Sequence, residues 1–362
     1  MPYSPGTNLL RRLAMGVAFS MSTSLACAQT TGDASTEANK ESPWLLVPKI
    51  SSNPKIGTSV GGVGGYLFQL DKESTASMAA LMANYSDTDS VTASGFFKGF
   101  WDGDSKRLIA GVAGGKIRND YEDYLGTGQE VSTTDDMKFA FVRYLQEVHK
   151  NWFLGGQAVY TNYYIDGEGL LTNEIFSLLG LTGYTSGGVG LTAMYDSRDN
   201  QNSPLRGMNL NLSNIAYREN LGGDQDFDTY RLQFKHYLPV GAKSVFAYRA
   251  VGRWSDDAPT GAYSSVTLRG YTRGQYLAPN SVMAEGELRW NLTGKWGLHL
   301  FGGVSCLYGD DKSCGDSENI YTSGGVGGEY MLKPSQRMVV SADYAVGEGD
   351  NQGFYLRFGQ AF

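Results

Sequence analysis

Most of the chain consists of short segments in which apolar and polar residues alternate, and a period of two is the pattern of β-strands. The segment Tyr230–Leu238 reads YRLQFKHYL, with apolar residues at nearly every second position. The segments Met208–Ser213, Phe246–Trp254 and Ala284–Leu292 repeat the pattern, with Asn, Ser, Arg and Glu on the polar face. A soluble β-sandwich also alternates. Segments of about ten residues with aromatic side chains near their ends favour a membrane barrel, whose apolar face meets lipid and whose polar face meets the lumen.

The number of such segments predicts the size of the barrel. Five strands follow a long connection at residues 257–279 and eleven precede it, sixteen in all. An even number places both ends of the chain on the same side of the membrane. The predicted fold is therefore all-β, a 16-stranded antiparallel transmembrane β-barrel of the outer membrane over residues 43–362. The expected strands lie near 43–51, 57–70, 74–86, 90–102, 106–120, 136–149, 152–165, 186–198, 207–219, 227–239, 244–256, 280–293, 297–308, 321–333, 337–347 and 353–362.

The connections between these strands alternate in length, which predicts the orientation of the barrel. Outer-membrane barrels have short turns in the periplasm and longer loops at the cell surface. The turns at 239–243, 293–295 and 333–336 are short and are expected in the periplasm. The long connections, expected at the surface, lie at 121–135, 166–185, 257–279 and 309–320.

The first 28 residues have the organisation of a secretory signal. Arg11 and Arg12 precede a short apolar run, and small residues lead to Ala26–Cys27–Ala28, an A-x-A cleavage pattern. Residues 1–28 are therefore predicted to be a signal peptide, followed by a short periplasmic segment at 29–42. Lipidation of Cys27 is the alternative. The predicted location is the outer membrane of a Gram-negative bacterium.

The C-terminal strand ends on an aromatic residue. Phe354, Leu356, Phe358 and Phe362 share one face, although Gln360 departs from the apolar spacing. This arrangement resembles the C-terminal signature that the outer-membrane assembly machinery reads, so Phe362 is expected to be the assembly signal. That machinery and the outer-membrane lipid are the first expected partners.

The net charge, the cysteines and the histidines exclude some classes of function. Without the signal peptide, 28 Lys and Arg stand against 37 Asp and Glu, a net charge of −9 that disfavours nucleic-acid binding. Cys306 and Cys314 bracket a polar loop in an exported chain and predict a local disulfide. No Ser-centred motif accompanies the three histidines, so no enzyme activity, catalytic residue, metal or cofactor is expected. These histidines are His149, His236 and His299.

Three motifs occur in a fixed order. The long connection contains Arg269–Gly270–Tyr271, and the next strand carries Glu287–Leu288–Arg289. Upstream lies Asp196–Ser197–Arg198–Asp199, followed by Pro204 and Gly207. Together with the terminal Phe, these residues resemble the R-G-F/Y, E-x-R and D-x-R-D motifs of the BamA/TamA-type assembly and secretion barrels, the bacterial surface antigen superfamily. The resemblance covers roughly the whole mature chain.

The resemblance implies that the loop folds back into the lumen, where Arg269 pairs with acidic residues on the wall. Alternation puts four acids on the lumen face, and Glu287 matches the wall acid of the family. Where the family commonly carries Asp, this chain has Gly303, and Glu329 could replace the missing partner. The four acids are Glu285, Glu287, Glu329 and Asp343.

The chain departs from the family at its front. Members that insert or secrete proteins carry periplasmic POTRA domains before the barrel, and the segment between Gln29 and the first strand is too short for one. The resemblance then implies a barrel-only member that transports protein or lipid, or assembles the outer membrane. A periplasmic partner would supply the missing module, or the chain would form homo-oligomers. The alternative is a passive porin-like channel or a structural outer-membrane protein, although a loop that plugs the lumen argues against open diffusion.

Removing Phe362 should impair assembly of the barrel, because the aromatic end is the expected recognition signal. The measurement is the yield of folded, heat-modifiable barrel in outer-membrane fractions. A normal yield from the truncated chain would contradict the assignment.

Overall fold

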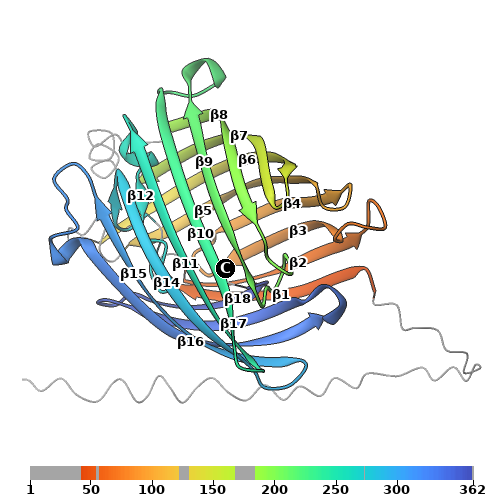
Figure 1. Cartoon of the computed structure of the whole chain (residues 1–362). Coiled ribbons are helices and arrows are strands. Elements are labelled where there is room, and N and C mark those ends of the chain that lie inside the picture. Colours follow the sequence, from red (N-terminus) through yellow and green to blue (C-terminus); the bar gives the residue numbers. More distant parts are fainter. Residues whose placement is uncertain (1–41, 54–56, 122–129, 168–183, 273, 361–362) are drawn as a thin grey trace, which may run out of the picture. The chain divides into compact units, whose positions relative to one another are not determined.

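The computed structural model describes residues 42–360, apart from 54–56, 122–129, 168–183 and 273. It is a closed antiparallel barrel of sixteen strands, which confirms the predicted fold (Figure 1). Residues 1–41, with the expected signal peptide, and Phe362 lie outside the described residues. Among the described residues, no helix is long and apolar enough to cross a membrane. The wall strands are β1 (Trp44–Asn53), β2 (Gly57–Phe68), β3 (Ser77–Ser86), β4 (Val91–Trp101), β5 (Lys106–Tyr121), β6 (Val131–His149), β7 (Trp152–Gly167), β8 (Tyr184–Asp196), β9 (Gly207–Tyr217), β10 (Phe227–Val240), β11 (Ser244–Asp256), β14 (Asn280–Asn291), β15 (Trp296–Tyr308), β16 (Ile320–Lys333), β17 (Met338–Gly347) and β18 (Gln352–Phe358).

Each wall strand pairs with its neighbours in the sequence, and β1 meets β18 to close the circle. The connection between β11 and β14 carries a separate two-stranded sheet, β12 (Ser264–Ser265) with β13 (Leu277–Ala278). We call the end of the barrel with the long connections the surface end and the opposite end the periplasmic end. Short 3₁₀ turns complete the connections: η2 (Glu219–Leu221), η3 (Thr260–Ala262), η4 (Ser317–Asn319) and η5 (Pro334–Gln336).

The two faces of the wall have opposite chemistry. Leu46, Leu81 and Leu191 expose 80%, 72% and 72% of their surface on the outside of the barrel. On the inside of β9, Asn209 and Asn211 are buried. An apolar surface of this extent is stable against lipid but not against water, so the strands are membrane-spanning. Cross-strand aromatic pairs mark the periplasmic edge of the apolar belt: Trp44 with Tyr66, Trp152 with Tyr195 and Trp296 with Tyr330.

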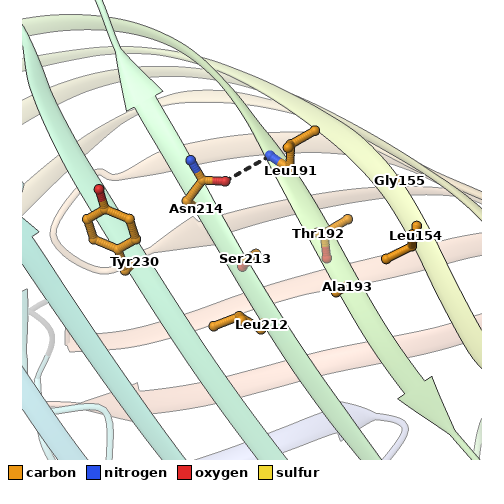
Figure 2. Close-up of a pocket in the computed structure, with 9 residues that line it drawn as sticks. All are labelled: Leu154, Gly155, Leu191, Thr192, Ala193, Leu212, Ser213, Asn214 and Tyr230. Carbon is orange, nitrogen blue, oxygen red and sulfur yellow. Dashed lines mark hydrogen bonds between the residues drawn. The ribbon is translucent and has the colours of Figure 1, made fainter.

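The wall is interrupted between β8 and β9, half-way round the barrel from the β1–β18 contact. The ladder pairs Val189 with Ala216 and resumes only at Thr192 with Ser213. In the gap, the side-chain Oδ1 of Asn214 accepts the hydrogen bond of the Leu191 N–H at 3.0 Å, as Figure 2 shows. The side chain therefore replaces a missing ladder bond. A cavity of about 690 Å³ lies beside this gap on the lipid side of the wall. It is lined by Leu154, Leu191, Leu212 and Tyr230.

Asn214→Ala should lower the free energy of unfolding by about 1–3 kcal/mol, because the Leu191 N–H would lose its acceptor inside an apolar belt. Asn209→Ala on the same strand is the matched control, since the Asn209 amide nitrogen has no hydrogen-bond partner among the described residues. The measurement is urea unfolding of the detergent-solubilised barrel. Equal effects of the two substitutions would show that the Asn214 bond does not support the wall.

Candidate functional site: a lumen loop bound to the barrel wall

The connection between β11 and β14 turns into the barrel and packs there. Val266, Leu268 and Tyr271 are at most 6% exposed and contact Leu307 and Tyr321 of the wall. Apolar side chains on both sides of Arg269 thus hold the middle of the loop against the inner wall. The main chain bends at Gly270, where φ is +99°, a conformation that glycine adopts without strain.

Arg269 binds acidic residues from two different parts of the wall. Its Nε donates to Glu285 Oε1 at 2.6 Å, and its Nη1 lies 2.8 Å from Glu287 Oε2 and 3.2 Å from Asp343 Oδ2. The guanidinium also lies 3.3 Å from the ring centroid of Phe301, a cation–π contact. Because Arg269 and the three carboxylates are each at most 5% exposed, these contacts replace hydration that the charges have lost.

Each of these carboxylates also binds a second cation from the wall. Arg249 pairs with Glu285 at 2.6 Å and Arg289 with Glu287 at 2.6 Å. Asp343 pairs with Arg357 of β18 at 2.5 Å and accepts a hydrogen bond from His299 Nε2 at 2.8 Å. We call Arg269 and these charged neighbours the lumen clasp. The clasp connects the loop to β11, β14, β15, β17 and β18, so the loop and five wall strands share one network.

The charge of Arg269 is secured by its partners. Burial alone would lower the pKa of the Arg269 guanidinium, but Glu287, Glu285 and Asp343 raise it above its usual value. Arg269 therefore keeps its charge in this buried site.

The loop also contacts the last strand directly. The Gly270 N–H donates to the Tyr355 hydroxyl of β18 at 3.1 Å. The Tyr271 hydroxyl donates to the Thr322 carbonyl and accepts from the Glu348 N–H, each at 2.9 Å. The Arg–Gly–Tyr motif thus reaches the wall through each of its three residues.

The structure brings together Arg269, Glu285, Glu287 and Asp343, but it places Glu329 elsewhere. Glu329 lies two residues nearer the periplasmic end than Gly327, the partner of Asp343, and accepts a hydrogen bond from Gln360 at 2.6 Å. At Gly303, an added Cβ would lie 2.7 Å from Leu268 Cδ2. The loop itself fills the space that a side chain at position 303 would need, and Asp343 supplies an acid from another strand.

Sequence reasoning missed Arg357, His299 and Tyr355 as members of the site. Their positions on the lumen face could be obtained from alternation, but not their contacts with the loop. The predicted disulfide between Cys306 and Cys314 is present at the surface end of β15, outside the lumen clasp. Within the described residues, no group of His, Cys, Asp and Glu side chains could hold a metal ion.

The D-x-R-D residues build a second contact at the periplasmic end. Asp196 pairs with Arg107 at 2.6 Å and with Arg198 at 2.7 Å. The turn that follows, residues 197–206, which we call the mouth turn, reaches the opposite side of the barrel. There Asp199 pairs with Arg337 at 2.7 Å, and Asn202 donates to the Gln336 carbonyl at 2.8 Å. The mouth turn thus crosses the periplasmic opening of the lumen.

Fold and site together define a transmembrane β-barrel whose lumen is occupied by its own loop and crossed by its own turn. The solved structures include barrels of the same fold. BamA from Haemophilus ducreyi lacking POTRA domains 1–3 is 12% identical, with 87% of this chain and 70% of that chain covered and a TM-score of 0.56. CdiB from Acinetobacter baumannii is 11% identical, with 88% and 60% covered and a TM-score of 0.59. CdiB from Escherichia coli is 12% identical, with 87% and 62% covered and a TM-score of 0.56.

These similarities concern the fold. No family model matches the chain, and no curated protein matches it in sequence. The chain spans about 60% of the length of the two CdiB chains. The chain has the fold of the BamA and CdiB barrels, as its motifs predicted, and this fold with its apolar belt places it in the outer membrane of a Gram-negative bacterium.

Arg269→Ala should raise the conductance of the barrel in planar bilayers and lower its free energy of unfolding by about 3 kcal/mol, because buried carboxylates would lose a partner. Arg118→Ala is the control. Arg118 pairs with Asp89 at an exposed site, and its loss should cost less than about 1 kcal/mol. An unchanged conductance in Arg269→Ala, with the wild-type barrel already open and ohmic, would favour the passive channel.

Proposed function

We propose that this barrel moves protein or lipid clients into or across the outer membrane by parting β1 from β18, while the lumen loop keeps the resting barrel closed. The observation that carries the proposal is the incomplete contact between these two strands. Ser51 pairs with Tyr355 and Ser52 with Phe354, whereas β1 pairs with β2 over its whole length. We call the β1–β18 contact the seam.

The sequence disfavours a longer seam. If the register of Ser51 with Tyr355 continued, Lys49 would face Arg357 on the lumen side, and like charges directly opposite each other destabilise a strand pair. Pro48 has no N–H to donate to a ladder. These residues lie in the periplasmic half of the wall, so the seam is paired only toward the surface end.

The lumen loop supports the paired part of the seam. Tyr355, whose main chain pairs with Ser51 of β1, also accepts the hydrogen bond of Gly270. Arg357 of the same strand is tied through Asp343 to Arg269. Release of the loop would therefore remove contacts from β18 at the point where it meets β1, which links unplugging of the lumen to opening of the seam.

A passive channel is the second candidate. A barrel of sixteen strands is wide enough for a water-filled lumen, which favours it. Against it stand the buried loop in the lumen and the mouth turn across the periplasmic opening, since neither is needed for diffusion of small solutes. The proposal involves no enzymatic step: His299 is bound to Asp343, and His236 lies on the lipid side, 3.0 Å from the Tyr248 hydroxyl. A periplasmic partner or a second copy of the chain would deliver the client.

A disulfide across the seam tests the proposal. Ser52→Cys with Phe354→Cys, in a background without Cys306 and Cys314, should lock the strands when oxidised, because positions 52 and 354 are directly paired. Leu46→Cys with Gly64→Cys locks β1 to β2 instead and is the matched control. The measurement is the protein and lipid composition of outer membranes from cells that carry each lock.

The oxidised seam lock should reproduce the composition of cells that lack the protein, and reduction should reverse it. The β1–β2 lock should behave as wild type. If the oxidised seam lock leaves a wild-type outer membrane in cells that change on deletion, lateral opening is excluded.

A further inference from the structure

A cavity of about 480 Å³ lies inside the barrel beside the seam. This volume is within the range of about 300–1,000 Å³ for small-molecule sites. Its inner wall is apolar and comes from β2, β3 and β4, and the mouth turn contributes Gln201 and Asn202. The apolar side chains are Val63, Met78, Ala80, Met82 and Phe96.

Three cations line the same cavity: Lys49, Lys98 and Arg357. Arg357 is paired with Asp343. Neither Lys49 nor Lys98 has an ion-pair partner among the residues that the structure describes, and Lys98 Nζ lies 5.0 Å from the ring centroid of Phe100. In a chain with a formal charge of −7, two unpaired cations against an apolar wall are an uncompensated cost that an anionic ligand would offset.

The cavity reaches the lipid side through the seam. Pro48 and Leu356 line it, although both occupy lipid-facing positions on β1 and β18. Pro48 and Leu356 reach the cavity because β1 and β18 are not paired at these residues. The two strands pair only at Ser51 and Ser52 of β1. A molecule in the membrane can therefore approach Lys49 sideways, between the first and last strands.

We propose that this cavity binds an anionic amphiphile, a single acyl chain with a carboxylate or phosphate head, taken from the membrane through the unpaired half of the seam. The acyl chain lies against Met78, Met82 and Phe96, and the head group pairs with Lys49 and Lys98. A free anion would leave the apolar wall uncovered, and a neutral lipid would leave the two lysines unpaired. The inference rests on the proposed function in one respect: the seam is the passage.

The test is binding of a fluorescent fatty acid, 11-(dansylamino)undecanoic acid, to the full barrel in phosphatidylcholine nanodiscs. Wild type should bind it saturably, and the double substitution Lys49→Gln, Lys98→Gln should weaken binding at least tenfold. Met82→Trp should abolish binding by filling the cavity. Lys235→Gln is the matched control, because Lys235 is also a lumen lysine without an ion-pair partner among the described residues but lies outside the cavity. Heat-modifiability shows that each variant is folded.

Competition identifies the chemistry. Dodecyl phosphate should displace the probe, dodecanol should do so at least tenfold less well, and inorganic phosphate should fail. Absence of saturable binding, equal binding by the double Gln variant, or displacement by inorganic phosphate as good as that by dodecyl phosphate would each overturn the proposal. Probe binding to the purified barrel requires no client, so it is independent of the seam-lock experiment. If the probe does not bind but the oxidised seam lock mimics deletion, only the proposed lipid site is excluded. If the probe binds but the seam lock has no effect, only the proposed function is excluded.

Discussion

The need to pair buried charge organises the interior of this barrel. Arg269 is carried into the lumen by an apolar loop, where it has lost most of its water, and carboxylates of the wall replace that water. Each carboxylate is in turn held by a further cation. Loop, wall and last strand therefore form one network, and moving any one member removes a charge partner from the others. In the proposed mechanism, these are the contacts that must break for the barrel to open.

At the seam, by contrast, buried charge is not fully paired. Lys49 has no counter-ion among the described residues, a longer seam would place it opposite Arg357, and β18 has only seven residues. The ladder is therefore shortest where the two ends of the chain meet, with two residue pairs between β1 and β18. The interrupted ladder between β8 and β9 lies half-way round the barrel from the seam.

Alternation was sufficient to predict the sixteen strands, because a wall with lipid on one face and a lumen on the other imposes period two on every strand. The inward loop and three of its partners followed from the Arg–Gly–Tyr motif and from the lumen-facing acids. The sequence could not predict that Glu329 lies away from the loop. How far along the barrel axis a residue lies depends on the register between neighbouring strands, which alternation does not specify. The partial pairing of β18 joins residues about 300 positions apart, and no local pattern encodes it. Gln360 departs from the apolar spacing because its side chain binds Glu329 and Ser203.

The coupling of the lumen clasp to the seam is the central claim, and a distance measurement tests it most directly. Spin labels at Leu46 of β1 and Tyr344 of β17, both exposed on the lipid face, report the separation of the first strand from the last hairpin. Pulsed electron paramagnetic resonance on nanodisc-embedded barrels should give a narrow distribution of distances between the two labels in the otherwise unmodified chain. It should give a broader and longer distribution when Arg269→Ala is added. An identical distribution with and without Arg269 would contradict the account, because the loop would then occupy the lumen without holding the seam.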